Sequence, residues 1–174
     1  MKGEKFILAH TEVGMHPTAD DYARAITARL GLLPRKKGAT EKMANILMQL
    51  YERTKQAQKL KKPELAVVTV EELGAFAGIS RQTMYEYLGR WIDLNLIAKT
   101  SYIHNSQVVV GYKLNGNTLE GAYEKAQVAV INHLELTGKY VKELQKTIKN
   151  EKISAAQQRN ITDKTLKDSS DSSE

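Results

Sequence analysis

The segment at residues 78–97, GISRQTMYEYLGRWIDLNLI, constrains the fold more than any other part of the chain. Ser80 can cap a helix that begins at Arg81, and Asn95 stands where helices commonly end in the left-handed region. Apolar side chains recur at spacings of four, three and three residues, which is one face of a helix. They are Met84, Leu88, Trp91 and Leu94. We therefore expect a helix as far as Leu94, with this face in the core and Trp91 as a packing anchor.

The other face of this helix is long and polar. It consists of Arg81, Gln82, Thr83, Tyr85, Glu86 and Arg90. A face that only meets water needs no particular chemistry, whereas a face that reads nucleic acid needs donors and acceptors near the helix N-terminus. The function of the chain therefore depends on what this polar face contacts.

The net charge of +6 is carried by the middle of the chain. Residues 35–115 hold thirteen basic and seven acidic side chains, whereas residues 1–34 hold four of each and residues 116–174 hold nine of each. A positive patch attracts polyanions and speeds encounter with them. The alternative is a lysine-rich surface that only meets water.

Several classes of protein are disfavoured by what the sequence lacks. Cysteine is absent, so there is no disulfide frame, thiolate zinc site or thiol nucleophile. No apolar run approaches the ~18 residues of a membrane span. His10 and His16 flank Glu12, but the histidines do not show the spacing of a metal site. Asp20 and Asp21 stand at a helix start, where the helix dipole explains them. We expect no enzyme, no metal, no cofactor and no membrane contact.

Caps and breaks divide the rest of the chain into short elements. Thr18 with Asp21 and Thr69 with Glu72 form capping boxes, and Thr40 can cap a second helix. That helix turns polar beyond residue 51, so its last turns should project into solvent. The expected elements are a short strand at 6–9, helices at 19–30, 40–62 and 70–77, a strand at 65–70, hairpin strands at 96–103 and 107–114 with a turn at 104–107, and a long helix from 118.

The order of elements in residues 38–115 resembles the winged helix-turn-helix. The resemblance lies in SRQTMYEYLGRW followed by DLNLI, a pattern of many bacterial and archaeal transcriptional regulators, with Asn95 in place of the usual Gly. It implies a mainly α fold with a small β-hairpin. We expect a strand and helix extension at 1–37, the winged domain at 38–115, a C-terminal helix at 116–153 and a disordered tail at 154–174.

The resemblance also implies roles for individual residues. The helix from Arg81 would enter the major groove, where Arg81 can hold guanine, Gln82 adenine and Glu86 cytosine, unless Glu86 pairs with Arg90. Backbone N–H groups at the Ser80 cap can take a phosphate. The wing tip, HNSQ, has no Arg or Lys, so the wing should contact phosphate only. The residues expected at DNA are Ser80, Arg81, Gln82, Thr83, Tyr85, Glu86, Arg90, Arg35, Lys36, Lys37, Lys99 and Lys113.

The C-terminal helix bears a near-heptad apolar stripe that predicts pairing with a second copy. Gly138 interrupts the stripe and leaves open a division into two helices. The alternative is that this helix folds back on the helix at 19–30. The residues expected at the dimer interface are Leu119, Tyr123, Ala126, Val130, Leu134, Val141 and Leu144.

These expectations together describe a dimeric, sequence-specific regulator that binds double-stranded DNA in the cytoplasm, associated with the nucleoid. One alternative is a nucleoid or replication-associated protein with little sequence preference. A second is a winged helix that binds protein and touches no base. A third is a regulator that holds a small effector between the N-terminal and C-terminal helices.

Overall fold

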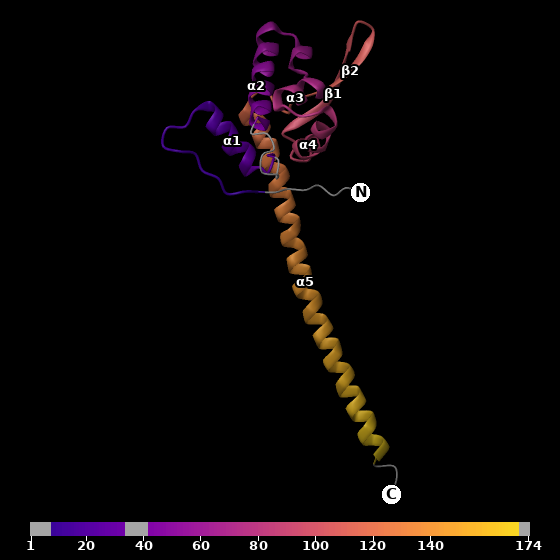
Figure 1. Ribbon diagram of the computed structural model, residues 1–174. Helices are drawn as coiled ribbons and strands as arrows, with labels where there is room; N and C mark the ends of the chain where they lie inside the picture. Colours follow the sequence, from indigo (N-terminus) through magenta and orange to yellow (C-terminus); the bar gives the residue numbers. More distant parts are fainter. Residues whose placement is uncertain (1–7, 34–41, 171–174) are drawn as a thin grey trace. The chain divides into compact units, whose positions relative to one another are not determined.

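The structure, a computed structural model, describes residues 8–33 and 42–170 and is mainly helical (Figure 1). One two-stranded antiparallel sheet accompanies the helices of this described part, which confirms the expected fold class of helices with a small hairpin. The chain divides into two compact units, Met1–Val130 and Ile131–Glu174. The elements are α1 (Ala19–Arg29), α2 (Met43–Leu60), the 3-10 helix η1 (Pro63–Ala66), α3 (Val70–Ala77), α4 (Arg81–Asp93), β1 (Ile97–His104), β2 (Gln107–Leu114) and α5 (Leu119–Ser170).

The predicted helix caps are present. The capping boxes of α1 (Thr18 and Asp21) and α3 (Thr69 and Glu72) are both formed, with each side chain accepting from the other residue's backbone N–H. Ser80 Oγ accepts from the backbone N–H of Thr83 at the start of α4. These bonds satisfy N–H groups that a helix cannot satisfy itself. The starts of these three helices are thus fixed by local sequence.

The first unit is built around one apolar core. It is formed by α2, α3, α4, the base of the hairpin and the first turns of α5. Trp91 is fully buried at its centre, as expected. Burying a side chain of this type stabilises a fold by about 1.5–3 kcal/mol, so the α4 stripe holds α4 firmly in place. The largest fully buried side chains of the apolar core include Trp91, Met43, Ile46, Leu50, Leu73, Met84, Leu88 and Leu94.

The turn between α3 and α4 is set by two glycines. Gly78 has a φ of 66°, a left-handed conformation that side chains resist. Gly74 accepts a hydrogen bond from Ile79 N at 2.9 Å, and a Cβ on Gly74 would lie only 2.8 Å from the carbonyl oxygen of Ile79. α4 therefore begins in close contact with α3, and its N-terminal face is fixed relative to that helix.

The hairpin is confirmed, with a tighter turn than expected. His104 pairs with Gln107, so only Asn105 and Ser106 form the loop, and both have positive φ values of 46° and 61°. Two residues of positive φ match the twist of the strands they join. The hairpin therefore extends one residue pair further than the sequence indicated.

The strand expected at 65–70 is wrong. Pro63 begins η1 there, and the only pairing left is a single bridge from Val68 to Tyr112, with both backbone hydrogen bonds at 2.8 Å. Val67 and Val68 are buried. Their β-branched side chains therefore reflect burial against the hairpin and not an extended strand.

The structure departs from the sequence-based predictions at the end of α2 and near the N-terminus. Thr54 and Ala57 are buried, whereas Lys55, Gln56 and residues 58–60 are exposed, so the last turns of α2 project into solvent on one side only. Leu8 and Ala9 form no strand, and Ala9 N instead donates to Arg29 O at 3.0 Å. The rest of the expected strand at 6–9 and the Thr40 cap lie outside the described residues.

α5 is one helix of 52 residues that continues through Gly138. The structure is helical from 154 to Ser170, so the expected disordered tail is wrong over that range. This stretch has Ala155 and Ala156 near its start and contains no Gly or Pro that would interrupt a helix. Residues 131–170 of this helix belong to the second unit. None of the described helices is long and apolar enough to cross a membrane.

Candidate functional site

The exposed face of α4 is the surface that the sequence singled out. Arg81, Gln82, Tyr85, Glu86 and Gly89 are all exposed along it, while the apolar face is buried. The structure thus brings four of the predicted contact residues onto one open surface. Their role at DNA stays a prediction.

Arg81 is held by two neighbours. Its Nε lies 3.1 Å from Glu71 Oε1, and its Nη2 donates to Tyr85 Oη at 3.4 Å. The guanidinium also lies 5.6 Å from the centre of the Tyr85 ring. The Tyr85 hydrogen bond and the Glu71 carboxylate raise the pKa of Arg81 above its ordinary value. A ligand of Arg81 must therefore share or displace Glu71, a partner that the sequence did not indicate because Glu71 already fits the first turn of α3.

Ser80 and Thr83 are largely occupied by one another. Ser80 Oγ accepts from Thr83 N at 3.2 Å, and the two hydroxyl oxygens lie 2.9 Å apart. Thr83 is only half-exposed. These two side chains fix the start of α4. Gln82 is exposed beside that start, and Arg81 is exposed there too, although Glu71 and Tyr85 hold it.

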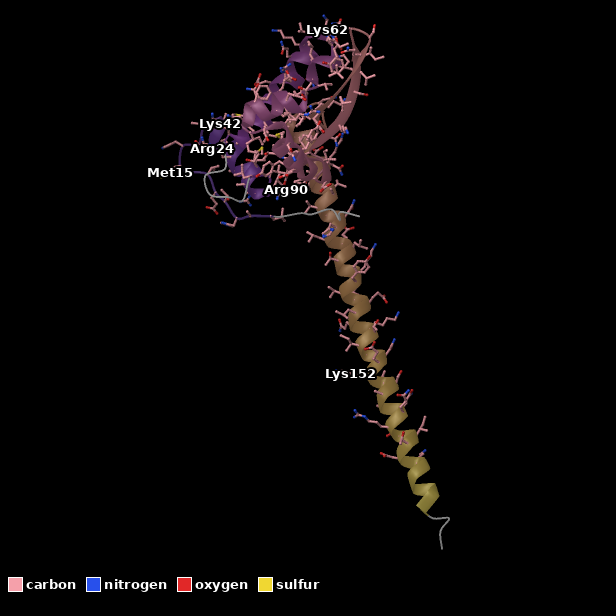
Figure 2. All side chains as sticks on the ribbon, turned by 45° about the vertical axis from the view of Figure 1, so that its right-hand side comes forward. Met15, Arg24, Lys42, Lys62, Arg90 and Lys152 are labelled. Carbon is pink, nitrogen blue, oxygen red and sulfur yellow. The ribbon has the colours of Figure 1, made fainter. Side chains whose placement is uncertain are left out.

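Arg90 does not belong to the open face. It is half-buried, one of its terminal nitrogens is buried without a hydrogen-bond partner, and its guanidinium lies 5.8 Å from the centre of the Tyr87 ring. Among the described residues it forms no ion pair with Glu86, so that expected i+4 pair is absent. Figure 2 labels Arg90 on the side-chain view. On a helical wheel it lies to one side of the exposed surface.

Gly89 lies in the middle of the exposed face, and sequence reasoning missed it. No atom lies within 4 Å of the position that a Cβ on Gly89 would take. A glycine inside a helix costs about 1 kcal/mol relative to alanine. Its effect here is to leave a bare stretch of backbone between Glu86 and Asp93, where a flat or convex ligand can approach closely.

The two lysines of the hairpin lie on opposite faces of its sheet. Lys99 is opposite Tyr112 and Lys113 is opposite Ala98, and adjacent pairs of a ladder point to opposite faces. Lys99 is exposed, while Lys113 is half-buried and lines a hollow with Lys61 and Lys125. Lys99 and Lys113 therefore lie on opposite faces of the hairpin, and the role of each at DNA stays a prediction.

The strand ends beside the polar turn of the hairpin carry exposed apolar side chains. Ile103 and Val108 are a directly opposed pair and are 78% and 69% exposed, with Val110 about half-exposed on the same face. These side chains offer no hydrogen bonds to phosphate. Beyond Lys99, the polar groups left for phosphate on this tip are the uncharged ones of the turn.

Positive charge gathers on α2 and not on α4. The exposed face of α4 holds one cation, Arg81, and one carboxylate, Glu86. By contrast, residues 53–62 hold five cations, and Lys42 and Lys62 flank the two ends of α2 (Figure 2). The basic loop Arg35 to Lys37 lies outside the described residues. The face that would read bases is thus separate from the segment that carries most of the charge.

The expected dimer residues fall into two groups. Ala126 is fully buried in the first unit, so it is wrong as an interface residue, while Leu119 and Val130 are partly buried against the same core. Tyr123 is exposed and lines a groove of about 500 Å³ together with Ile26 of α1. The alternative that this helix folds back on α1 stays a prediction. Exposed side chains remain in the second unit, at heptad spacing: Leu134, Val141, Leu144 and Ile148.

Comparison of the chain with models of protein families, with characterised proteins and with solved structures finds no match. Among the described residues no three His, Cys, Asp or Glu side chains are grouped to hold a metal. His10 Nε2 does lie 3.6 Å from Glu12 Oε1, but both side chains are largely exposed. The candidate site therefore rests on the geometry of α4 and its surroundings alone.

Proposed function

We propose that the chain is a winged-helix protein that binds double-stranded DNA as a dimer and regulates transcription. The observation that carries the proposal is the exposed face of α4. It follows a tight glycine turn, presents Arg81 and Gln82 at the helix N-terminus and has bare backbone at Gly89. Arginine and glutamine are the side chains that hold guanine and adenine in the major groove.

Preorganisation of Arg81 favours recognition over a solvated role. A free arginine loses side-chain entropy when it binds, whereas Arg81 is already oriented by Tyr85 and Glu71. Glu71 makes the site selective, because it competes with weak partners of the guanidinium. A bidentate contact to guanine supplies two hydrogen bonds in place of that single ion pair.

Affinity for DNA then comes from lysines outside α4. Phosphate contacts supply most of the salt-dependent binding energy of such proteins. Lys99 is exposed on β1, and Lys36 and Lys37 belong to the basic segment of the sequence between α1 and α2. Replacing one of them should weaken binding to all sequences about equally and lower the salt slope by about 1.

Pairing of two chains through the second unit completes the proposal. Leu134, Val141 and Ile148 recur every seven residues and Leu144 lies between them, which is the spacing of a coiled-coil seam. Most of the stability of a helix in water comes from packing of its apolar face. An exposed apolar stripe therefore favours packing against a second helix. A second copy presents the same stripe.

The exposed apolar side chains on the strands beside the hairpin turn favour one other function, a protein-docking domain. Ile103 and Val108 suit an apolar partner better than phosphate. The test is DNA binding at low salt by fluorescence anisotropy with a selected-sequence pool. Recovery of a common motif, lost in Arg81→Ala and Gln82→Ala, supports the regulator. Absence of binding at low salt would support docking of protein instead.

A further inference from the structure

A second candidate site lies on the first unit, and its described lining includes no residue of α4. It is a hollow of about 430 Å³ between the C-terminal end of α2, the end of β2 and the start of α5. Three lysines line it, Lys61, Lys113 and Lys125, and no Asp or Glu is among the described residues that line it. None of the three forms an ion pair within the described part of the chain. Three uncompensated ammonium groups around one concave surface are complementary to a multiply charged anion.

The frame of this hollow is built by specific contacts. Asn115 donates its backbone N–H to Leu96 O at 3.0 Å and its side-chain amide to Asn95 O at 2.8 Å. Its remaining side-chain oxygen accepts from Lys125 Nζ at 3.1 Å. Asn115 is therefore fixed on three sides, and it holds the Lys125 ammonium at the rim.

The opposite wall is equally constrained. Gln58 Nε2 donates to the carbonyl oxygen of Asn117 at 2.6 Å, which ties α2 to the chain before α5. Gly116 lets the chain pass close to the first turn of α5, because a Cβ on it would lie 2.6 Å from Ala122 N. Lys61 ends α2 with a φ of 54°, a conformation unusual for a residue with a side chain. The three lysines thus stand on a defined scaffold rather than on a mobile surface.

The floor of the hollow is apolar. Ala57, Ala66 and Leu114 are buried beneath the lysines. Pockets that bind small molecules commonly combine such a floor with a few polar groups and a volume of roughly 300–1,000 Å³. A DNA backbone would contact the lysine tips without needing this floor. Glu124, which precedes Lys125 in the sequence, lines a neighbouring hollow that Asn115 and Lys125 also border.

We propose that this hollow binds a small molecule that carries a di- or triphosphate group. Lys61, Lys113 and Lys125 hold the phosphate oxygens, and the apolar floor takes the ring of a nucleotide where one is attached. This site is independent of DNA binding by α4. The phosphate could come from free pyrophosphate or from a nucleotide, and the experiment below distinguishes the two.

The test is titration of the full chain with pyrophosphate and, separately, with ATP, followed by calorimetry and by amide chemical shifts. We expect shifts confined to the amides around Lys61, Asn115 and Gly116. Lys113→Gln with Lys125→Gln should weaken binding at least about tenfold, since each ammonium makes charge-assisted hydrogen bonds. Tighter binding of ATP would identify a nucleotide, and equal binding would identify the phosphate alone.

The matched control is Lys55→Gln with Lys59→Gln, which removes the same charge from exposed lysines of α2 outside the hollow. Thermal unfolding confirms that both double variants are folded. Equal weakening in the two variants, or shifts spread over all surface lysines, would overturn the proposal. The proposal would also be overturned if the native chain did not bind pyrophosphate and only the Lys113 and Lys125 double variant lost DNA affinity. In that case the hollow would be a contact for DNA phosphate.

Discussion

Substitution of Gly89 tests whether the exposed face of α4 is a free surface or a binding surface. No atom lies within 4 Å of a Cβ built there, and the glycine does not have a positive φ. Alanine therefore meets no steric cost and gains the difference in helix propensity. We expect Gly89→Ala to raise the free energy of unfolding by about 1 kcal/mol and the melting temperature by about 2–4 °C.

A larger side chain at Gly89 should weaken DNA binding, even though it does not weaken the fold. Gly89→Leu introduces a good helix former at a position whose Cβ meets no atom within 4 Å, so this variant should unfold at or above the temperature of the native chain. At DNA it would hold the helix away from the base edges. Loss of a single base contact is worth about 1–3 kcal/mol, so we expect affinity to fall about tenfold or more.

The assays are urea unfolding and fluorescence anisotropy on a selected DNA site. Gly138→Ala is the matched control, because Gly138 is also helical, exposed and without atoms within 4 Å of a Cβ, but lies in the second unit. It should stabilise α5 and leave DNA affinity unchanged. Destabilisation by Gly89→Ala would refute the open geometry, and unchanged DNA affinity of Gly89→Leu would refute the binding role of this face.

Three further predictions concern the fold and its assembly. Gly74→Ala should destabilise the first unit by about 1–3 kcal/mol in urea unfolding, because its Cβ would meet the Ile79 carbonyl oxygen; an unchanged midpoint would contradict this packing. Leu144→Asp should reduce the mass in light scattering from dimer to monomer, while Lys146→Asp, outside the apolar stripe, should not. The pKa of Asp21 is lowered, mainly by the backbone N–H of Thr18 and then by the Thr18 hydroxyl. The carboxylate therefore stabilises α1 above the ordinary pKa of 3.8, and this stabilisation is lost as the pH falls below 3.8. Circular dichroism should show this loss of helix in the native chain and not in Asp21→Asn.

Local features of the sequence predicted much of the fold. The caps at Thr18, Thr69 and Ser80 depend on neighbours three residues away, and the stripe of α4 depends on helical period alone. Both kinds of pattern are read directly from consecutive residues. The hairpin followed for the same reason, since its two-residue loop lies between β-rich runs.

Features that depend on distant contacts could not be predicted. Val67 and Val68 have the composition of a strand, but only one bridge to Tyr112 forms because η1 occupies the preceding residues. Ala126 belongs to the heptad stripe and yet is buried in the core of its own chain. Periodicity shows that a face is apolar and does not show which surface covers it.

The candidate site shows the same division. The polar residues of α4 were identified from their place on one helix, but Arg90 lies aside because Tyr87 and the core hold it. The pairing of Arg81 with Glu71 joins two helices and has no signature in either. Gly89 carries no chemistry of its own, and its significance depended on seeing an open surface around it.

The central claim is that α4 reads DNA sequence, and selection of binding sites from random duplex DNA tests it most directly. The native chain, Arg81→Ala, Gln82→Ala and Lys99→Ala are each selected and then measured over a salt series. We expect the native chain to yield one motif and Arg81→Ala and Gln82→Ala to relax it at separate positions. Lys99→Ala should keep the motif while its salt slope falls by about 1. Equal loss of affinity on every sequence in all three variants, with no motif for the native chain, would contradict the account.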